Sequence, residues 1–148
     1  MAEGLLQVGT QAPAWEAQTS DGARASLADF RGAQAVLLMF YPQDDTPGCT
    51  KQMCTARDES AEYAAAGVAR FGVNPGDQAS HRGFVDKYTL DFPLLVDEGS
   101  AIAAAYGVLR DDGYTGRATY LIDRDGTIVY AQAGAHGAAE VLEALRGR

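Results

Sequence analysis

The pattern of apolar and polar residues predicts short strands and helices in alternation. Residues 35–40 and 67–73 are runs dominated by apolar, branched and aromatic side chains, which is typical of strands buried in a sheet. Between them, apolar or small side chains recur every three or four residues from Met53 to Tyr63, a spacing that predicts a helix with one buried face. The central part of the chain is therefore predicted to be a strand, a helix and a second strand.

Turn residues and helix caps divide the rest of the chain into similar elements. Ser20-Asp21-Gly22 and Asp123-Arg124-Asp125-Gly126 each separate the two strands of a predicted hairpin. The other expected elements are a helical turn at 26–30, a helix from a cap at Asp77 to about residue 88, a short strand at 92–95 that lies at an edge or starts irregularly, a helix at 101–106 between a Ser100 cap and Gly107, and a helix at 138–145. Together they predict an α/β fold with a mixed central sheet flanked by helices on both faces, in one domain that spans residues 1–148.

The segment that joins the first buried strand to its helix holds the candidate chemistry. Thr46 is placed as a helix N-cap, and Pro47 occupies the first helical position, where proline is favoured. Cys49 is then the third residue of the helix, where its sulfur faces unpaired backbone N–H groups and the positive end of the helix dipole. Both stabilise a thiolate, so the pattern predicts a reactive Cys49. The alternative is a small buried cysteine that only packs.

The second cysteine, Cys54, follows five residues later in the same predicted helix. Five residues along an α-helix separate two Cα atoms by roughly 8.6 Å, whereas a disulfide spans about 7 Å at most. A bond between Cys49 and Cys54 therefore cannot form while the helix is intact. If the two residues exchange redox states, the first turns of the helix must unwind.

Composition and charge disfavour several classes of partner. The chain is 47% hydrophobic and carries 20 acidic against 12 basic side chains, which gives a formal net charge of −8 at pH 7. This charge disfavours nucleic acid and anionic membranes, and no apolar run approaches the ~20 residues of a membrane span. The first residues lack the basic and apolar regions of a signal peptide, which favours a cytoplasmic protein. In the cytosol, two cysteines are more often redox-active than structural.

Four other polar residues have simple interpretations. Asp44 and Asp45 are expected to be turn residues, and His81 is expected on a helix surface or at a helix cap. His81 and His136 are isolated in the sequence, and the C-x4-C spacing of the cysteines does not match a structural zinc site. No metal site is predicted.

The segment from Tyr41 to Cys54 resembles the active-site signature of the peroxiredoxins. Its C-x4-C spacing resembles the bacterioferritin-comigratory-protein or PrxQ branch of that family. From about Pro13 onward, further motifs follow the order of the family: Arg57-Asp58, Gly72-Val73, Ser80-His81, Phe84, Lys87, Phe92-Pro93-Leu94-Leu95, Tyr106-Gly107-Val108 and Arg117-Ala118-Thr119-Tyr120-Leu121-Ile122-Asp123.

The resemblance implies a thioredoxin-like fold and a role for five residues. Cys49 would be the peroxidatic cysteine and Cys54 the resolving one, while Pro42, Thr46 and Arg117 would complete the peroxide site. The chain departs from the pattern of the branch at Gln43, where lysine is usual, at Gln52, where glutamate is usual, and in the loop 74–77.

The activity implied by the resemblance is that of a thiol peroxidase. Cys49 would reduce hydrogen peroxide or an organic hydroperoxide and become a sulfenic acid, and Cys54 would resolve it as an intramolecular disulfide. Thioredoxin or a similar dithiol would recycle the protein, which is expected to act as a monomer without haem, flavin or metal. Two other classes remain open: a non-enzymatic redox sensor that uses the same disulfide, and a thiol–disulfide oxidoreductase, although the C-x-x-C motif of that class is absent.

Overall fold

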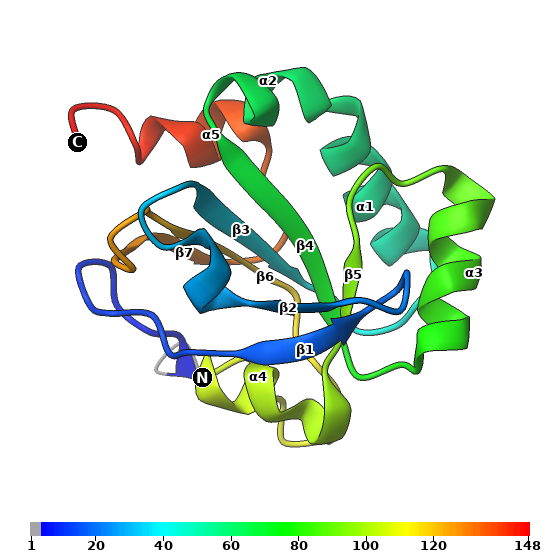
Figure 1. The fold of residues 1–148 in the computed structure, drawn as a ribbon. Helices are drawn as coiled ribbons and strands as arrows, with labels where there is room; N and C mark the ends of the chain where they lie inside the picture. Colours follow the sequence, from blue (N-terminus) through cyan, green and yellow to red (C-terminus); the bar gives the residue numbers. More distant parts are fainter. Residues whose placement is uncertain (1–3) are drawn as a thin grey trace.

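The computed structural model describes residues 4–148, and within them seven strands form one mixed sheet (Figure 1). The strands are β1 Glu16–Thr19, β2 Arg24–Ser26, β3 Ala35–Phe40, β4 Val68–Asn74, β5 Leu94–Val96, β6 Ala118–Ile122 and β7 Ile128–Ala133. Their order across the sheet is β2-β1-β5-β4-β3-β6-β7. Strands β3, β4 and β5 pair in parallel, and the remaining pairings are antiparallel.

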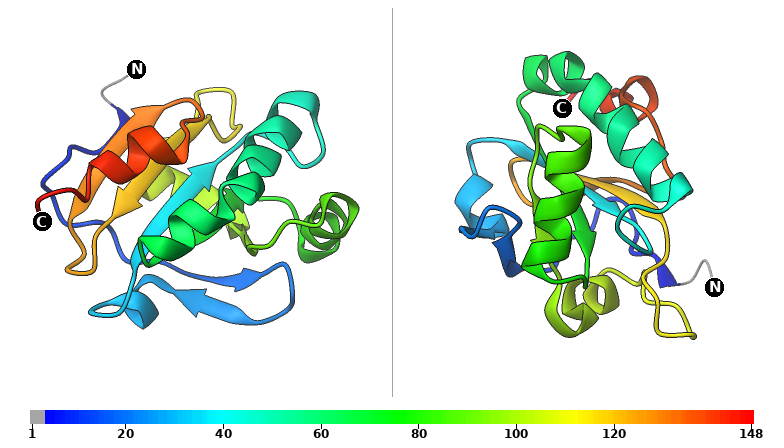
Figure 2. Two further views of the ribbon diagram at one scale, coloured as in Figure 1. Left: turned by 90° about the horizontal axis from the view of Figure 1, so that it is seen from above. Right: turned by 90° about the vertical axis from the view of Figure 1, so that its right-hand side faces the viewer.

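Helices cover both faces of this sheet. They are α1 Pro47–Asp58, α2 Ser60–Ala65, α3 Gln78–Tyr88, α4 Ala101–Ala105 and α5 Ala138–Glu143, with 3-10 turns η2 Leu27–Phe30 and η3 Glu98–Ser100. Helices α1, α2, α3 and α5 pack into the apolar core on one face, and α4 and η2 pack into the core on the other (Figure 2). The α/β class and the mixed sheet with helices on both faces are confirmed.

Strand β3 lies between the two cores, which explains its continuous apolar sequence. Leu37 and Met39 point into the core under α1, whereas Val36, Leu38 and Phe40 point into the core over α4. No residue of β3 is more than 4% exposed, so a polar side chain at any of its positions would need a buried hydrogen-bond partner.

The helix predicted from Met53 to Tyr63 is divided in two. Glu59 adopts φ −95° and ψ 18°, so α1 ends at Asp58 and α2 begins at Ser60. The carboxylate of Glu59 accepts a hydrogen bond of 3.1 Å from the backbone N–H of Ala138, the first residue of α5. Glu59, the residue between α1 and α2, therefore links the end of α1 to the start of α5.

Two alternatives were predicted for residues 92–95, an edge strand or a strand with an irregular start, and the structure shows the second. Strand β5 lies inside the sheet, between β1 and β4, and it begins only at Leu94. The irregular start that proline favours is present, because Pro93 precedes the strand and its missing N–H falls outside the ladder.

Ser100 does not cap the helix that follows it. It adopts a left-handed conformation with φ 59°, and its side chain makes no capping hydrogen bond. The buried carboxylate of Asp97 takes that role by accepting hydrogen bonds from the N–H groups of Ile102 at 2.7 Å and Ala103 at 2.9 Å. Gly107 ends the segment with φ 72°, as the pattern predicts.

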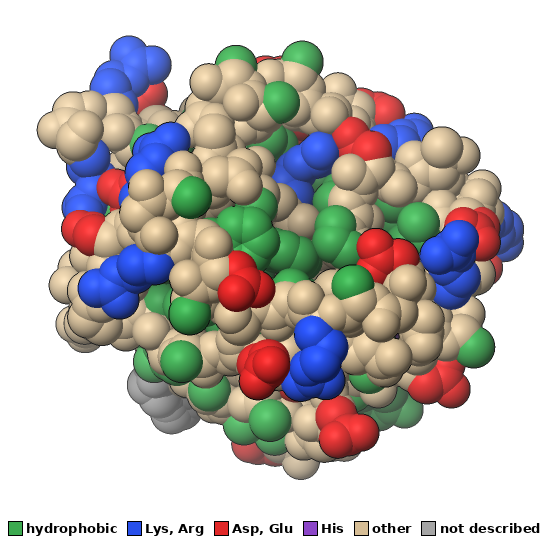
Figure 3. Space-filling model, in the orientation of Figure 1, with side chains coloured by type: hydrophobic (Ala, Val, Ile, Leu, Met, Phe, Trp, Pro, Cys, Tyr) green, Lys and Arg blue, Asp and Glu red, His purple; other side chains and the backbone are tan. Residues whose placement is uncertain are grey.

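The surface in the orientation of Figure 1 mixes acidic and basic side chains. Figure 3 shows lysine and arginine groups beside aspartate and glutamate groups, around a shallow central hollow where apolar side chains gather. This face has no continuous basic area of the kind that binds nucleic acid. In the described part of the chain, no helix is long and apolar enough to cross a membrane.

Two glycine positions test how closely β4 packs against its neighbours in the core. A Cβ at Gly72 in β4 would lie 2.5 Å from Leu94 Cδ2 and 3.2 Å from both Met53 Sδ and Tyr41 Cε1. Gly72→Ala is therefore expected to lower the free energy of unfolding by about 1–3 kcal/mol, because the buried neighbours must shift. Urea denaturation measures it.

The matched control is Gly83→Ala in α3. A Cβ at Gly83 meets nothing within 4 Å, so alanine is expected to stabilise the helix by about 0.5–1 kcal/mol. Equal effects of the two substitutions would contradict the close packing of β4 against α1.

Candidate active site

Cys49 lies at the carboxyl end of β3, in the first turn of α1. The loop 41–46 follows the strand, Thr46 is the N-cap, Pro47 is the first helical residue and Cys49 is the third, as predicted. The Cys49 side chain is fully buried and packs into the core under α1. The sulfur is therefore in a desolvated position at the positive end of the helix.

The Thr46 hydroxyl does not cap the helix. Thr46 has the extended backbone of an N-cap, but its Oγ1 donates to the carbonyl of Gln43 at 3.1 Å and makes no capping hydrogen bond. This hydrogen bond stabilises the loop before the helix. The N–H groups in the first turn of α1 therefore have no hydrogen bond from the Thr46 side chain.

Arg117 reaches Cys49 from a distant part of the sequence. Strand β6 runs antiparallel to β3, with Ala118 opposite Phe40, so Arg117 lies beside the loop that leads to Cys49. Its Nη2 donates to Cys49 Sγ at 3.4 Å. A Cβ at Gly48 would lie 3.1 Å from the same nitrogen, so the missing side chain at Gly48 leaves room for the guanidinium.

Gln52 orients this arginine, a role that the sequence did not indicate. Its side chain is 6% exposed, and its Oε1 accepts a hydrogen bond of 2.5 Å from Arg117 Nη1. Its Nε2 donates to the carbonyl of Phe40 at 3.5 Å. Arg117 forms no ion pair with a carboxylate of the described residues, so no carboxylate neutralises the charge that it presents to Cys49.

Cys54 is not brought next to Cys49. Both are free thiols in the same unbroken helix, with Cys49 buried and Cys54 half-buried. Met53, between them, is fully buried in the core. The predicted helix over both cysteines is confirmed, and their bonding would require that helix to open.

Pro42 is half-buried in the loop 41–46, which is held from the side of β4. The Asn74 side chain donates from Nδ2 to the carbonyls of Tyr41 and Pro42, each at 2.9 Å. Asn74 therefore joins the end of β4 to the start of this loop.

The prediction for His81 is wrong, and that for Asp44 is incomplete. His81 is completely buried in α3, and its Nδ1 lies 2.6 Å from Asp44 Oδ2. Asp44 also accepts hydrogen bonds from Tyr41 at 2.6 Å and Ser80 at 2.7 Å. Nothing in the sequence around Asp44, between Pro42 and the N-cap Thr46, indicates that its side chain is buried. The position of His81, two turns before the end of an amphipathic helix, does not indicate burial either.

Asp45 is a turn residue, as expected, with φ 57°. Its exposed carboxylate also bonds Lys87 Nζ at 2.9 Å and the Tyr88 hydroxyl at 2.8 Å. The loop before Cys49 is thus attached to both ends of α3.

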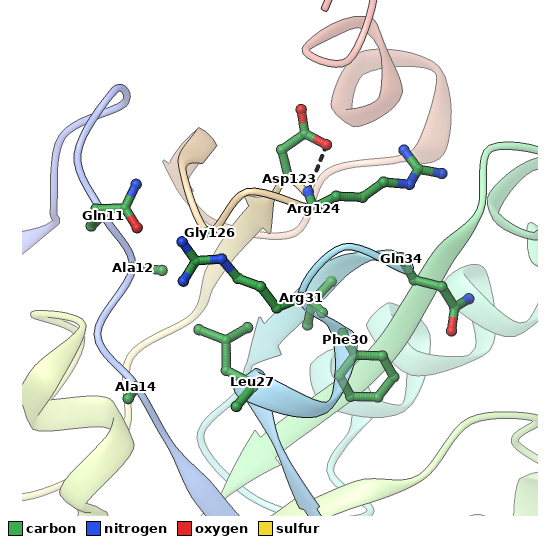
Figure 4. A pocket seen from close by; sticks show the side chains of 12 residues that line it. Gln11, Ala12, Ala14, Leu27, Phe30, Arg31, Gln34, Asp123, Arg124 and Gly126 are labelled. Carbon is green, nitrogen blue, oxygen red and sulfur yellow. Dashed lines mark hydrogen bonds between the residues drawn. The ribbon is translucent and has the colours of Figure 1, made fainter.

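Two cavities lie near β3, and Cys49 lines neither of them. One of about 370 Å³ lies beside α1 and is lined by residues that include Gly48, Gln52 and His136. Another, of about 120 Å³, lies at the amino end of β3, between Leu27, Phe30, Arg31 and Arg124 (Figure 4). The second contains no cysteine or histidine and is at the end of β3 away from Cys49. Residues 4–148 contain no group of three or more histidine, cysteine or acidic side chains arranged to hold a metal ion.

Comparison with known proteins identifies the class. Residues 8–131 match the AhpC/TSA family, and the chain belongs to that family. Within it, the relatives are proteins named peroxiredoxin Q or bcp, so the resemblance of the Cys49 segment to that branch is confirmed.

Three relatives illustrate the similarity. Chloroplastic peroxiredoxin Q of Triticum aestivum is 42% identical over 129 residues, which cover 86% of this chain and 59% of that protein. The putative peroxiredoxin bcp of Coxiella burnetii is 39% identical over 130 residues, which cover 83% of this chain and 85% of that protein. A solved structure of the Xanthomonas campestris bacterioferritin comigratory protein, studied for its alkyl peroxide reduction activity, has a TM-score of 0.81 and 27% identity over 89% of this chain and 90% of that one.

These comparisons confirm the thioredoxin-like peroxiredoxin fold. The chain spans less than two thirds of the length of the plant relatives that it matches.

The position of Gly48 gives a test of the arginine contact. Gly48→Ala is expected to displace the guanidinium from Cys49 and to slow alkylation of Cys49 by iodoacetamide at neutral pH by about tenfold, because the thiolate loses its cation. If the effect acts through Arg117, the double variant Gly48→Ala, Arg117→Ala should react no more slowly than Arg117→Ala alone. Additive losses would show that Gly48 acts on Cys49 by another route.

Proposed function

We propose that the protein is a thiol-dependent peroxidase that reduces hydrogen peroxide and organic hydroperoxides. The observation that carries this proposal is the 3.4 Å contact between Arg117 Nη2 and Cys49 Sγ in the first turn of α1. A guanidinium keeps its charge throughout the physiological pH range, so it stabilises a thiolate and also the charge that develops on a departing oxygen. Membership of the peroxiredoxin Q/bcp group supports the same chemistry.

In the first step, the Cys49 thiolate attacks one oxygen of the peroxide. A sulfur–oxygen bond forms as the oxygen–oxygen bond breaks, and Cys49 becomes a sulfenic acid. The other oxygen takes up a proton and leaves as water or an alcohol. In this proposal Arg117, Thr46 and the opening N–H groups of α1 hold the two oxygens, and Pro42 shields the pocket from water.

In the second step, the Cys54 sulfur attacks the sulfenic sulfur of Cys49. A disulfide forms within the chain and water leaves. Because both cysteines belong to α1, residues 49–54 must unwind first, and the fully buried Met53 loses core contacts as they do. This local opening is the energetic cost of resolution.

An external dithiol then returns both cysteines to thiols, and thioredoxin is the expected reductant. The two cysteines of one chain suffice for the cycle, which supports a monomer in which residues 1–148 act as one domain. A compartment that supplies a dithiol, such as the cytosol, fits this requirement. The alkyl peroxide reduction activity of the Xanthomonas campestris relative supports organic hydroperoxides as substrates.

Peroxide consumption driven by thioredoxin and thioredoxin reductase tests the proposal. Cys49→Ser is expected to abolish peroxide reduction, because no other sulfur contacts Arg117 among the described residues. Cys54→Ser is expected to retain one rapid oxidation of Cys49 and to lose more than about 90% of turnover with thioredoxin, because the sulfenic acid is not resolved.

Three results would contradict the assignment. Near wild-type peroxide reduction by Cys49→Ser would remove Cys49 from the first step. Insulin reduction without peroxide consumption would indicate a thiol–disulfide oxidoreductase. Oxidation that stops after one equivalent, with thioredoxin present, would indicate a redox sensor.

The helix opening has its own test in amide hydrogen exchange. The amides of residues 49–56 are expected to be protected in the reduced protein and to exchange at least about tenfold faster after disulfide formation, since the helical hydrogen bonds are lost. The amides of α3 serve as the internal control and should not change. Equal protection of 49–56 in both states, with the Cys49–Cys54 bond confirmed by mass spectrometry, would contradict the opening.

A further inference from the structure

The loop 41–46 that carries Pro42 and Thr46 is tied to α3 by a buried pair, Asp44 and His81. The His81 side chain is fully buried and the Asp44 side chain is 7% exposed, and His81 Nδ1 lies 2.6 Å from Asp44 Oδ2. The same carboxylate accepts hydrogen bonds from the Tyr41 and Ser80 hydroxyls. Each of its oxygens is therefore engaged within the loop or by α3.

The partners of His81 determine where its protons lie. Nε2 is 3.0 Å from the carbonyl oxygens of both Asn74 and Leu95, which only accept hydrogen bonds, so Nε2 must carry a hydrogen. Nδ1 faces an oxygen of Asp44, and without a proton between them two lone pairs would meet at 2.6 Å. One proton must therefore lie between Nδ1 and the carboxylate. The raised pKa of His81 and the lowered pKa of Asp44 assign it to the imidazole, so the two side chains form an imidazolium–carboxylate pair.

Few other charges act on this pair. From the loop 41–46, the Tyr41 hydroxyl faces the pair, and from β4 and β5 only backbone carbonyls contact it. The carboxylate of Asp97, after β5, is occupied by N–H groups in the first turn of α4. On α3, Ser80 bonds Asp44, while the carboxylate of Asp77 is occupied by the backbone N–H of Ser80. Burial opposes the charge on each member of the pair. Their mutual hydrogen bond, however, raises the pKa of His81 and lowers the pKa of Asp44 from their ordinary values.

We propose that Asp44 and His81 are positioning residues for peroxide reduction, and that the proton between them sets an alkaline limit to the reaction. The inference rests on the proposed peroxidase function. Asp44 precedes Thr46 by two residues and follows Pro42 by two, so its attachment to α3 determines where both residues stand relative to Cys49. A shift of about 1 Å in such a loop is enough to cost up to about 100-fold in rate.

The direction of the pH dependence follows from the protonation of His81. Below the ordinary pKa of a histidine, the pair is complete, and the attachment of the loop is fully present. As the pH rises through the raised pKa of folded His81, the bridging proton is lost and the Nδ1 lone pair faces the carboxylate. The contact of Asp44 with His81 is then lost, and the loop is held to α3 only through Ser80, Lys87 and Tyr88, so the rate of peroxide reduction falls at alkaline pH.

Two substitutions at position 44 separate positioning from charge. In Asp44→Asn, the amide can donate to a neutral His81 Nδ1 and accept from Tyr41, so the attachment persists without a titrating proton. In Asp44→Ala, the attachment through position 44 is lost at every pH, and only the contacts of Asp45 with α3 remain. The matched control is Asp86→Asn, which makes the same change at an exposed carboxylate of α3 that bonds only Arg82 among the described residues.

The rate of Cys49 oxidation by hydrogen peroxide is measured in single-turnover quench-flow, in a Cys54→Ser background, from acid to alkaline pH. The parent and Asp86→Asn are expected to share a fall in rate at alkaline pH. Asp44→Asn should stay within about threefold of the parent at neutral pH and lack that fall, whereas Asp44→Ala should be slower by about tenfold or more throughout. Circular dichroism melting establishes that each variant is folded.

Nitrogen NMR of the two imidazole rings tests the pair without any peroxide, and His136→Gln assigns the signals. His81 is expected to keep both ring nitrogens protonated at pH values where a free imidazole is neutral, and to lose this in Asp44→Asn. A neutral His81 in the parent at those pH values would overturn the ion pair.

The remaining outcomes are equally decisive. A folded Asp44→Ala with the parent rate would overturn the positioning role, and an alkaline fall that persists in Asp44→Asn would assign the lost proton to another group. If no peroxide oxidises Cys49 of the parent at any pH, the proposed function is wrong. Alkylation of Cys49 by iodoacetamide across the same variants then still decides whether the pair positions the loop.

Discussion

The central strand β3 is the constraint on which the rest of the structure depends. It is buried on both faces and pairs with β4 on one side and β6 on the other. Phe40, its last residue, lies opposite Val73 and Ala118, so Asn74 and Arg117 lie beside the loop that follows β3. Asn74 extends from β4 and holds the loop backbone, and Arg117 enters from the start of β6 and contacts Cys49. Both sides of the site are thus determined by strand pairing.

The site combines a frame held by hydrogen bonds with a helix that must open in the proposed cycle. The frame consists of strand ends and α3, which holds the loop through the buried Asp44 and the exposed Asp45. The first turns of α1 carry both cysteines and are stabilised by Met53 and by their own backbone hydrogen bonds. In the proposed cycle, attaching the loop to α3 would keep Pro42 and Thr46 in place while residues 49–54 change conformation.

Local patterns predicted most elements of the fold because their causes are local. The two buried strands, both hairpins and the Asp77 cap follow from side-chain periodicity, turn residues and a cap within three residues of its donor. The predictions were open or wrong where a distant partner decided the outcome. Strand β5 is interior because β1 returns to pair with it, and Asp97 replaces Ser100 as a cap because η3 turns its carboxylate toward α4.

The sequence by itself determined that Cys49 stands third in a helix after a proline, and that five residues separate it from Cys54. Both properties depend only on neighbouring residues and the helical repeat. The tertiary structure alone decided which groups surround that sulfur. Arg117 is 68 positions from Cys49, and His81 is 37 positions from Asp44. No local pattern encodes such contacts, because they arise only when strand register and helix packing bring the two segments together.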